Sequence, residues 1–142
     1  MIEVVAIKIE HMTELLKREA VAYVRPLFTP EVLKNIERNP HTAAILMDGK
    51  VVFAGGVSQY WPQRGEAWAF FDDSCRKNFI PIVRAARKWL DACPVSRIEA
   101  AVDIDATQAH RWVKLLGFEL EAPRLRKYRP DGKDCALYAR VK

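Results

Sequence analysis

The sequence predicts an α/β domain: a mixed, twisted sheet of seven strands with four helices packed on it. Two Asp-Gly pairs, Asp48-Gly49 and Asp131-Gly132, lie between segments of strand character. Such pairs are typical of hairpin turns, because both positions accept a positive φ. Capping signals at Thr29 and Asp105 mark the starts of two helices, and Gly117 marks an end. Strand, helix and strand follow one another between residues 67 and 104, which favours a parallel pair inside the sheet.

The first half of the chain predicts four strands and two short helices. The strands are expected, in chain order, at Glu3–Ile9, Thr42–Met47, Val51–Gln59 and Ala67–Phe71. The last of these is almost wholly apolar, so we expect it near the centre of the sheet, after a loop over Trp61–Gly65. A first helix is predicted by the helical spacing of Met12, Leu15, Leu16 and Ala20. The second helix starts with Thr29 as its cap and Pro30 at its first position, and it ends near Asn39-Pro40.

The second half predicts two helices and three strands. The third helix is expected near Ile80–Ala92, with one apolar face made by Phe79, Val83, Ala86 and Leu90. Asp105 and Gln108 form a capping box before a fourth helix, whose buried stripe is predicted to be Ala109, Trp112, Val113 and Leu116. The strands are expected at Arg97–Ile104, Phe118–Tyr128 and Cys135–Val141. The predicted order is therefore β-α-α-β-β-β-α-β-α-β-β.

Length and composition are those of one domain spanning residues 1–142, large enough to bury its own core. No apolar run approaches the roughly 20 residues that span a bilayer, and the first residues lack the pattern of a signal peptide. The three cysteines are far apart and form no C-x-x-C pair, and the three histidines have no ligand spacing. We therefore expect no disulfide framework and no metal site, no membrane partner, and a reducing cytoplasm as the location.

The formal charge of +5 lies wholly in the second half of the chain. Residues 1–71 carry eight basic and eight acidic side chains, whereas residues 72–142 carry fifteen and ten. Such an excess suits the phosphates of coenzyme A, nucleic acid or an acidic protein, and it also suits a solvated basic surface. Arg124, Arg126 and Tyr128 would share one face of a strand and could hold nucleic acid, although a charged edge hairpin is the favoured interpretation.

Two segments together resemble the GNAT (N-acetyltransferase) superfamily. The first is the fourth helix followed by Leu116-Gly117-Phe118, and the second is the long hairpin Phe118–Val141 that ends in Leu137-Tyr138-Ala139-Arg140. The order of elements is similar to the GNAT fold over nearly the whole chain. The resemblance implies acetyl transfer from acetyl-CoA to the amine of a small molecule or protein. The pattern also looks like a small phage or prophage branch of GNAT-like proteins, some of which are virion or assembly proteins.

The resemblance implies a cofactor site at the end of the fourth strand. The backbone around Phe70, Phe71 and Asp72 would pair with the pantetheine arm, and Arg76, Lys77 and Asn78 would hold the pyrophosphate at the start of the third helix. In this position Phe79 and Pro81 stand where the family has small residues, and proline has no N–H to donate. Asp72 and Asp73 would repel phosphates, or would instead cap the third helix.

The same resemblance implies one catalytic residue. Glu66, just before the fourth strand, matches a carboxylate that takes the proton of the acceptor amine. The position of the family's tyrosine acid is Val113 here, and that of a common asparagine is Ala106. Cys75 lies beside Arg76 and Lys77, which could lower its pKa, but an ordinary loop thiol is the favoured interpretation.

Two functions therefore stay open. One is an N-acetyltransferase with an atypical pyrophosphate loop, and the other is a catalytically inactive GNAT-fold binding or assembly protein of phage or prophage origin. A phage origin would place the protein in a bacterial host cell or in a virion. Nucleic acid is the less expected partner, and the sheet edges admit a homodimer.

Overall fold

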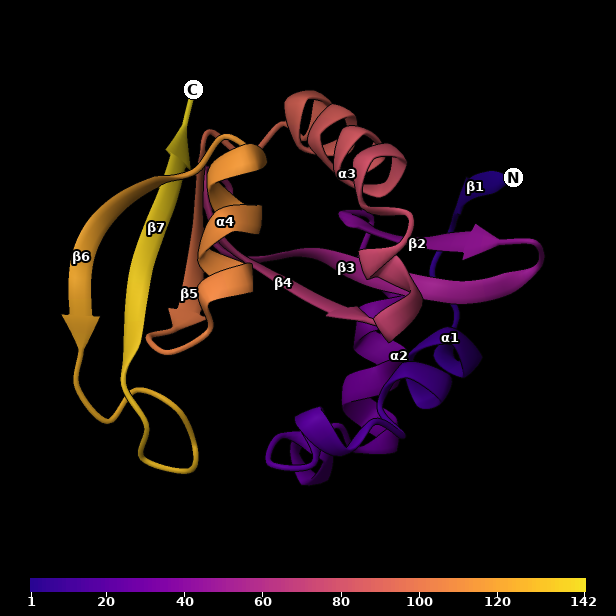
Figure 1. The fold of residues 1–142 in the computed structure, drawn as a ribbon, viewed down its shortest axis with the longest axis horizontal. Coiled ribbons are helices and arrows are strands. Elements are labelled where there is room, and N and C mark those ends of the chain that lie inside the picture. The colour runs from indigo at the N-terminus through magenta and orange to yellow at the C-terminus, as the bar shows by residue number, and fades with distance from the viewer. The chain divides into compact units, whose positions relative to one another are not determined.

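The computed structural model describes residues 1–142 and has the predicted order of strands and helices (Figure 1). The strands are β1 (Ile2–Val5), β2 (Thr42–Met47), β3 (Lys50–Trp61), β4 (Arg64–Phe71), β5 (Arg97–Asp103), β6 (Glu119–Leu125) and β7 (Cys135–Val141). The α-helices are α1 (Ile9–Leu15), α2 (Pro30–Arg38), α3 (Phe79–Ala92) and α4 (Thr107–Leu115). Short 3-10 turns are η1 (Glu19–Val21), η2 (Arg25–Leu27) and η3 (Asp73–Arg76). None of the helices is both long enough and apolar enough to cross a membrane.

The seven strands form one mixed sheet in the order β1-β2-β3-β4-β5-β7-β6. The apolar strand β4 is central, as predicted. The chain groups into two compact units, and we call Met1–Gly56 with Trp68–Ile82 the first unit and Val57–Ala67 with Val83–Lys142 the second unit. The expectation of a single domain stays a prediction.

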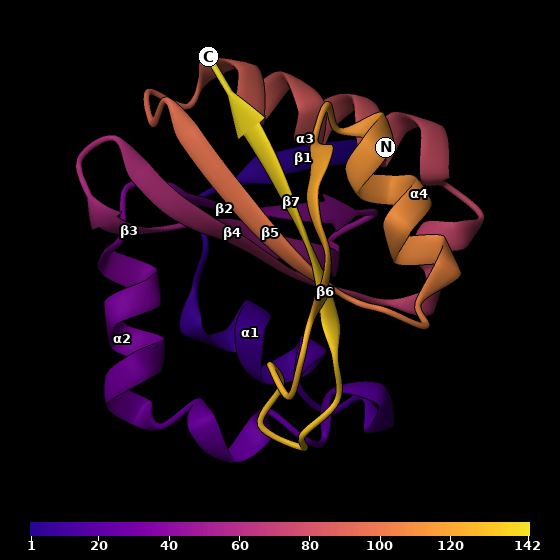
Figure 2. The ribbon, with the colours of Figure 1, turned by 90° about the vertical axis from the view of Figure 1, so that its left-hand side faces the viewer.

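The first unit packs α1 and α2 against one face of its strands (Figures 1 and 2). Its core consists of Ile7, Met12, Leu15, Leu16, Ala44, Val51 and Ala54. Helix α2 begins as predicted, since the Thr29 hydroxyl accepts the N–H of Val32. A Cβ on Gly55 would lie 2.7 Å from the Trp68 carbonyl oxygen, so glycine permits the close approach of β3 and β4 there.

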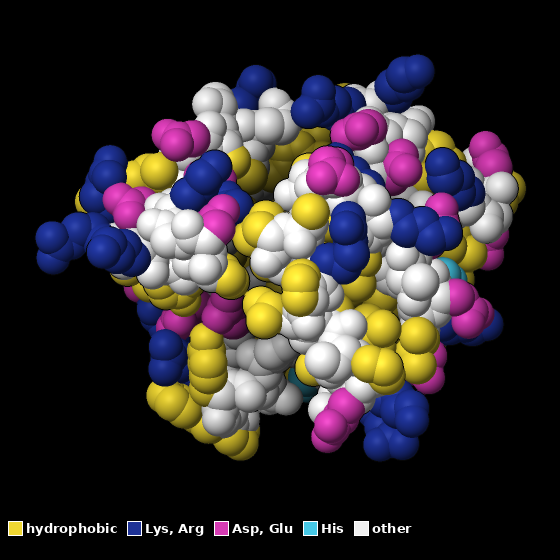
Figure 3. All heavy atoms as spheres, turned by 90° about the horizontal axis from the view of Figure 1, so that it is seen from below, with side chains coloured by type: hydrophobic (Ala, Val, Ile, Leu, Met, Phe, Trp, Pro, Cys, Tyr) yellow, Lys and Arg dark blue, Asp and Glu magenta, His cyan; other side chains and the backbone are white.

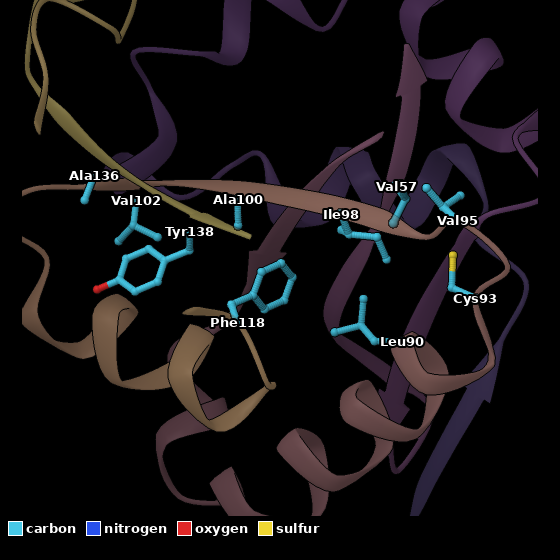
Figure 4. Close-up of a cluster of buried hydrophobic side chains, with 10 residues drawn as sticks. All are labelled: Val57, Leu90, Cys93, Val95, Ile98, Ala100, Val102, Phe118, Ala136 and Tyr138. Carbon is cyan, nitrogen blue, oxygen red and sulfur yellow. The ribbon is translucent and has the colours of Figure 1, made fainter. Parts of the chain in front are cut away.

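The second unit packs α4 and the C-terminal part of α3 against β5 and β7 (Figure 4). Figure 4 shows Leu90 and Phe118 pointing from the helical side toward Ile98 and Ala100 of β5, with Tyr138 of β7 beside them. The predicted stripe of α4 is confirmed: Trp112 is buried, and Ala109, Val113 and Leu116 pack against this core.

The first strand and helix depart from their predicted bounds. β1 ends at Val5, whereas the alternating sequence predicts a strand to Ile9. A capping interaction starts the helix early, because the backbone N–H of Lys8 donates to His11 Nδ1 at 3.1 Å. The helix also ends early, at Leu15, so the prediction that Ala20 lies on its buried face is wrong.

The predicted cap of the fourth helix is also wrong. Helix α4 has Ala106 as its N-cap, with no side-chain hydrogen bond, and Asp105 lies outside it. Asp103 Oδ1 accepts the N–H of Asp105 at 3.1 Å, and the Asp103 carbonyl accepts the N–H of Ala106. This turn places the helix start one residue later than the sequence signal.

Candidate functional site

The segment after β4 is a tight 3-10 turn held by an aspartate. Asp72 Oδ1 accepts the N–H of Ser74 at 2.8 Å, so Asp72 caps η3 rather than α3. This hydrogen bond holds the pKa of Asp72 below its ordinary value. Lys50 Nζ lies 3.7 Å from the other carboxylate oxygen, and Asp73 is paired with Arg18 at 2.7 Å. Both acids of the turn are therefore neutralised, and the repulsion expected from them is weakened.

Arg76 and Lys77 are exposed and form none of the ion pairs of the structure. They lie at the end of η3 and directly before α3. The side chain of Asn78 already makes one hydrogen bond, since its Nδ2 donates to the Ser74 carbonyl at 3.2 Å. The first turn of α3 has few backbone donors, because Pro81 has no N–H and the N–H of Ile82 is given to the Asn78 carbonyl. The turn offers positive charge with a reduced set of N–H donors.

The backbone at the end of β4 alternates between its two edges. The N–H of Asp72 donates to the Val52 carbonyl of β3 at 2.8 Å, so it is already used inside the sheet. By alternation Phe70 also faces β3, and Phe71 faces the opposite edge. The Phe71 carbonyl accepts a hydrogen bond from Arg18 Nη1. The ring of Phe70 packs edge-on against Phe28, with centroids 5.3 Å apart.

Glu66 is half-buried on β4 and is held by a tyrosine. Tyr60 OH donates to Glu66 Oε2 at 2.5 Å, across the short turn between β3 and β4. The hydrogen bond to Glu66, with burial as the second cause, raises the pKa of Tyr60 to about 12. Tyr60 is therefore a neutral donor near pH 7, and it binds Glu66 through Oε2. Glu66 forms no ion pair.

A network of two arginines and two glutamates lies beside Glu66 in the same unit. The parallel ladder pairs Glu66 with Glu99. Glu99 is only 6% exposed and accepts hydrogen bonds from Arg64 Nε and Arg97 Nε, both at 2.7 Å. The bond from Arg64 is the main cause that holds the pKa of Glu99 below its ordinary value. Arg97 also donates two hydrogen bonds to Glu121, at 2.7 and 3.1 Å.

The guanidinium of Arg64 lies against two exposed aromatic rings. Its carbon is 4.5 Å from the centroid of Tyr60 and 4.9 Å from that of Trp61. Sequence reasoning missed Tyr60, Arg64 and Glu99. A signal existed for Glu99, which is a lone acid inside the apolar run of β5.

Cys75 is fully buried, its thiol donates to the Val52 carbonyl, and burial raises its pKa to about 11, which fits the favoured interpretation of an ordinary thiol and not a lowered pKa. His110 is half-buried, its Nδ1 bonds Tyr138 OH at 2.7 Å and its Nε2 bonds the Ile104 carbonyl. Arg126 and Tyr128 lie beyond the end of β6 at Leu125, so they do not share a strand face with Arg124.

The basic side chains of the β6–β7 hairpin are partly neutralised by acids of the hairpin and of β5. Arg124 pairs with Asp134 at 2.6 Å, and Arg129 pairs with Asp103 and with Asp131. On the face drawn in Figure 3, Lys and Arg side chains lie among Asp and Glu side chains. All three cysteines are free and buried. No three His, Cys, Asp or Glu side chains are grouped so that they could hold a metal ion.

The residues predicted for the site thus fall into two groups. Phe70, Phe71, Asp72, Arg76, Lys77 and Asn78 lie in the first unit. Glu66 lies in the second unit with Tyr60 and the arginine–glutamate network. Val113, at the position of the family's tyrosine acid, packs against the core of the second unit.

Comparison with solved structures identifies the fold. An acetyltransferase of the GNAT family from Streptococcus pneumoniae superimposes with a TM-score of 0.73 at 13% identity, over 99% of both chains. The ribosomal-protein-S5-alanine acetyltransferase from Vibrio fischeri gives 0.72 at 19% identity, over 99% of this chain and 92% of that one. A ribosomal L7/L12 alpha-N-protein acetyltransferase in complex with coenzyme A gives 0.70 at 16%, over 99% and 93%.

No protein-family model and no curated protein matches the sequence. The full-length likeness at low identity shows the fold alone. The chain has the GNAT acetyltransferase fold, with its seven-stranded mixed sheet and four helices.

Proposed function

We propose that this chain is an acetyl-CoA-dependent N-acetyltransferase. The observation that carries the proposal is the pair of exposed cations without ion pairs, Arg76 and Lys77, directly after β4 in a chain of GNAT fold. A diphosphate carries several negative charges, and these side chains supply positive charge beside the start of a helix. The pairing of Asp72 with Lys50 and of Asp73 with Arg18 weakens the main electrostatic objection.

The residues present fit coenzyme A, with fewer backbone donors than the family pattern supplies. Arg76 and Lys77 would hold the phosphates, and Asn78 would order the turn through its bond to Ser74. Of the three residues expected to pair with the pantetheine arm, Phe71 is the one whose backbone faces away from β3. The backbones of Phe70 and Asp72 face β3, so these residues would hold β4 in the sheet and would not contact the arm.

Acetyl-CoA supplies an activated acetyl group as a thioester. Glu66 takes a proton from the acceptor amine on Oε1 while Tyr60 keeps Oε2 in place. The acetyl group would pass to the amine nitrogen as its carbon–sulfur bond breaks, and the departing thiolate would take a proton from solvent, since Val113 has none to give. With no tyrosine acid, positioning of the two substrates would supply most of the rate enhancement.

The acceptor is an amine of a small molecule or a protein. Proteins with this fold include a spermidine N-acetyltransferase chimera and a ribosomal-protein-S18-alanine N-acetyltransferase from Escherichia coli, so the fold serves both classes.

The thermal midpoint with and without millimolar acetyl-CoA tests the proposal. A ligand at a hundred times its dissociation constant stabilises a protein by about 2.7 kcal/mol, which raises the midpoint by roughly 8 °C for a chain of this size. Arg76→Glu should abolish the shift. Lys88→Glu changes the charge equally on the exposed side of α3 and should keep it. No shift in the unaltered protein would refute the proposed function.

The alternative is a catalytically inactive binding or assembly protein of phage origin. The substitutions Phe79, Pro81, Val113 and Ala106 favour it, but the comparisons give it no support. A chain that binds acetyl-CoA and turns over no amine in an acceptor screen would favour this alternative.

A further inference from the structure

A side chain of the first unit already occupies a hydrogen-bond acceptor that the proposed function needs. Arg18, between α1 and η1, donates from Nη1 to the carbonyl of Phe71 at the end of β4. That carbonyl faces the edge of β4 opposite β3, because the next N–H, that of Asp72, is used by Val52. It is therefore the acceptor available for an amide of the pantetheine arm.

Arg18 is held in this position by several contacts. Its Nη2 donates to Asp73 Oδ1 at 2.7 Å, and its guanidinium carbon lies 5.4 Å from the centre of the Phe71 ring. Its backbone carbonyl accepts a bond from Arg25 Nη2 at 2.8 Å, and its side chain is only 24% exposed. Arg25 also donates to the Leu16 carbonyl at 2.6 Å, which fixes the turn from which Arg18 extends.

We propose that Arg18 competes with the pantetheine arm for the Phe71 carbonyl and so lowers the affinity of the protein for acetyl-CoA. We call this contact of Arg18 with Phe71 the latch. The inference rests on the proposed function, because it concerns the same cofactor strand. For the pantetheine arm to pair with Phe71, the guanidinium must leave, and a hydrogen bond from a charged donor is exchanged for one from a neutral amide. Charged hydrogen bonds are the stronger of the two, so the latch weakens binding of the arm.

Arg18 also has an opposing effect, since it neutralises Asp73 next to the phosphate-binding cations. The Asp73 side chain is 78% exposed, so solvent screens its charge and this effect is the smaller one. Removal of Arg18 should therefore tighten acetyl-CoA binding.

The experiment compares acetyl-CoA affinities by titration calorimetry. Arg18→Ala should bind acetyl-CoA about tenfold more tightly than the unaltered protein. Arg18→Met, which keeps the apolar stem over Phe71, should show the same gain and covers the case in which the alanine variant folds poorly. Lys17→Ala removes the same charge from the neighbouring residue, whose side chain contacts Glu14, and should leave the affinity unchanged.

A second probe separates the arm from the phosphates. Phosphoadenosine diphosphate, the nucleotide half of coenzyme A, lacks the pantetheine arm, so its affinity should not rise in Arg18→Ala. If the unaltered protein binds acetyl-CoA and neither Arg18 variant binds it more tightly, the latch is wrong and the proposed function stands. If neither the unaltered protein nor the variants bind acetyl-CoA, the proposed function falls and the latch with it.

Discussion

Glu66 and Glu99 are opposite each other in the parallel ladder of the second unit, yet their partners differ in kind. Glu66 is bound by the neutral Tyr60, whereas Glu99 is bound by Arg64 and Arg97. Glu99 is thus fully used for structure. Glu66 forms no ion pair, which is why we propose it, and not Glu99, as the base.

The base role of Glu66 can be tested by kinetics. Glu66→Gln should lower kcat for amine acetylation by roughly a hundredfold or more, because the amine loses its proton acceptor, and should leave acetyl-CoA affinity unchanged. Tyr60→Phe should lower kcat by less than about tenfold, because it loosens the carboxylate without removing it. Glu119→Gln, an exposed carboxamide replacement on β6, is the matched control. Unchanged turnover in Glu66→Gln would remove the residue from the mechanism.

Glu99 is a stability residue whose effect should depend on pH. Glu99→Gln leaves two arginines without their shared anion, and we expect it to lower the free energy of unfolding by about 2 kcal/mol at pH 7, less than for a wholly buried pair because the arginines are about one third exposed. The folded pKa of Glu99 is depressed below 4.5, so its contribution is present above that pH and is lost as the pH falls below it. Denaturant unfolding at pH 7 and below pH 4 should show the difference between the two proteins shrinking. A difference independent of pH would contradict this.

At the scale of elements, the junction from α4 to β6 is fixed by its own backbone. The N–H of Gly117 donates to the Lys114 carbonyl and that of Phe118 to the Val113 carbonyl, which together make a Schellman end. Gly117 has a φ of 94°, and the next residue, Phe118, enters the core of the second unit.

Gly117→Ala should lower the free energy of unfolding more than Gly49→Ala. Both glycines have a positive φ, which costs an alanine about 1–2 kcal/mol. A Cβ at Gly117 would also lie 3.0 Å from Arg140 Nε, whereas one at Gly49 would meet nothing within 4 Å. The difference between the two losses in free energy of unfolding, measured with urea, gives the cost of the contact with Arg140. Equal losses would show that the backbone conformation alone decides the cost.

For the molecule as a whole, the positive charge is spread over several elements. Four arginines of residues 72–142 form ion pairs, namely Arg97, Arg124, Arg129 and Arg140. The other basic side chains of this half are distributed over η3, α3, α4 and the β6–β7 loop, Arg76 and Lys77 among them. A net charge of +5 in this arrangement suits a small polyanion better than a long phosphate backbone.

We therefore expect weak retention on immobilised single-stranded DNA, with elution below about 0.2 M salt. A protein that neutralises many phosphates would show a steep salt dependence and elute later. Retention beyond that concentration, lost in a variant of Arg126 and Lys133, would instead favour a nucleic-acid surface on the β6–β7 hairpin.

The sequence by itself determined the order of all eleven strands and helices, the hairpin turn at Asp48-Gly49, the cap at Thr29 and the left-handed Gly117. These features depend on neighbours within a few residues, whose hydrogen bonds and φ preferences are local. It also indicated the GNAT fold, which the comparisons confirm, and the candidates Glu66 and Arg76, which stay predictions.

Only the tertiary structure decided which hydrogen-bond partners the polar side chains of the candidate site have. Tyr60 could be paired with Glu66, and Arg64 with Glu99, only when strand register was known. Arg18 lies 53 residues from Phe71 in the chain, and no local pattern marks it. His110 contacts Tyr138 only because β7 is brought beside α4. Short-range preferences select the elements, but the partner of a polar side chain is selected by which strands and turns are brought together across long stretches of chain.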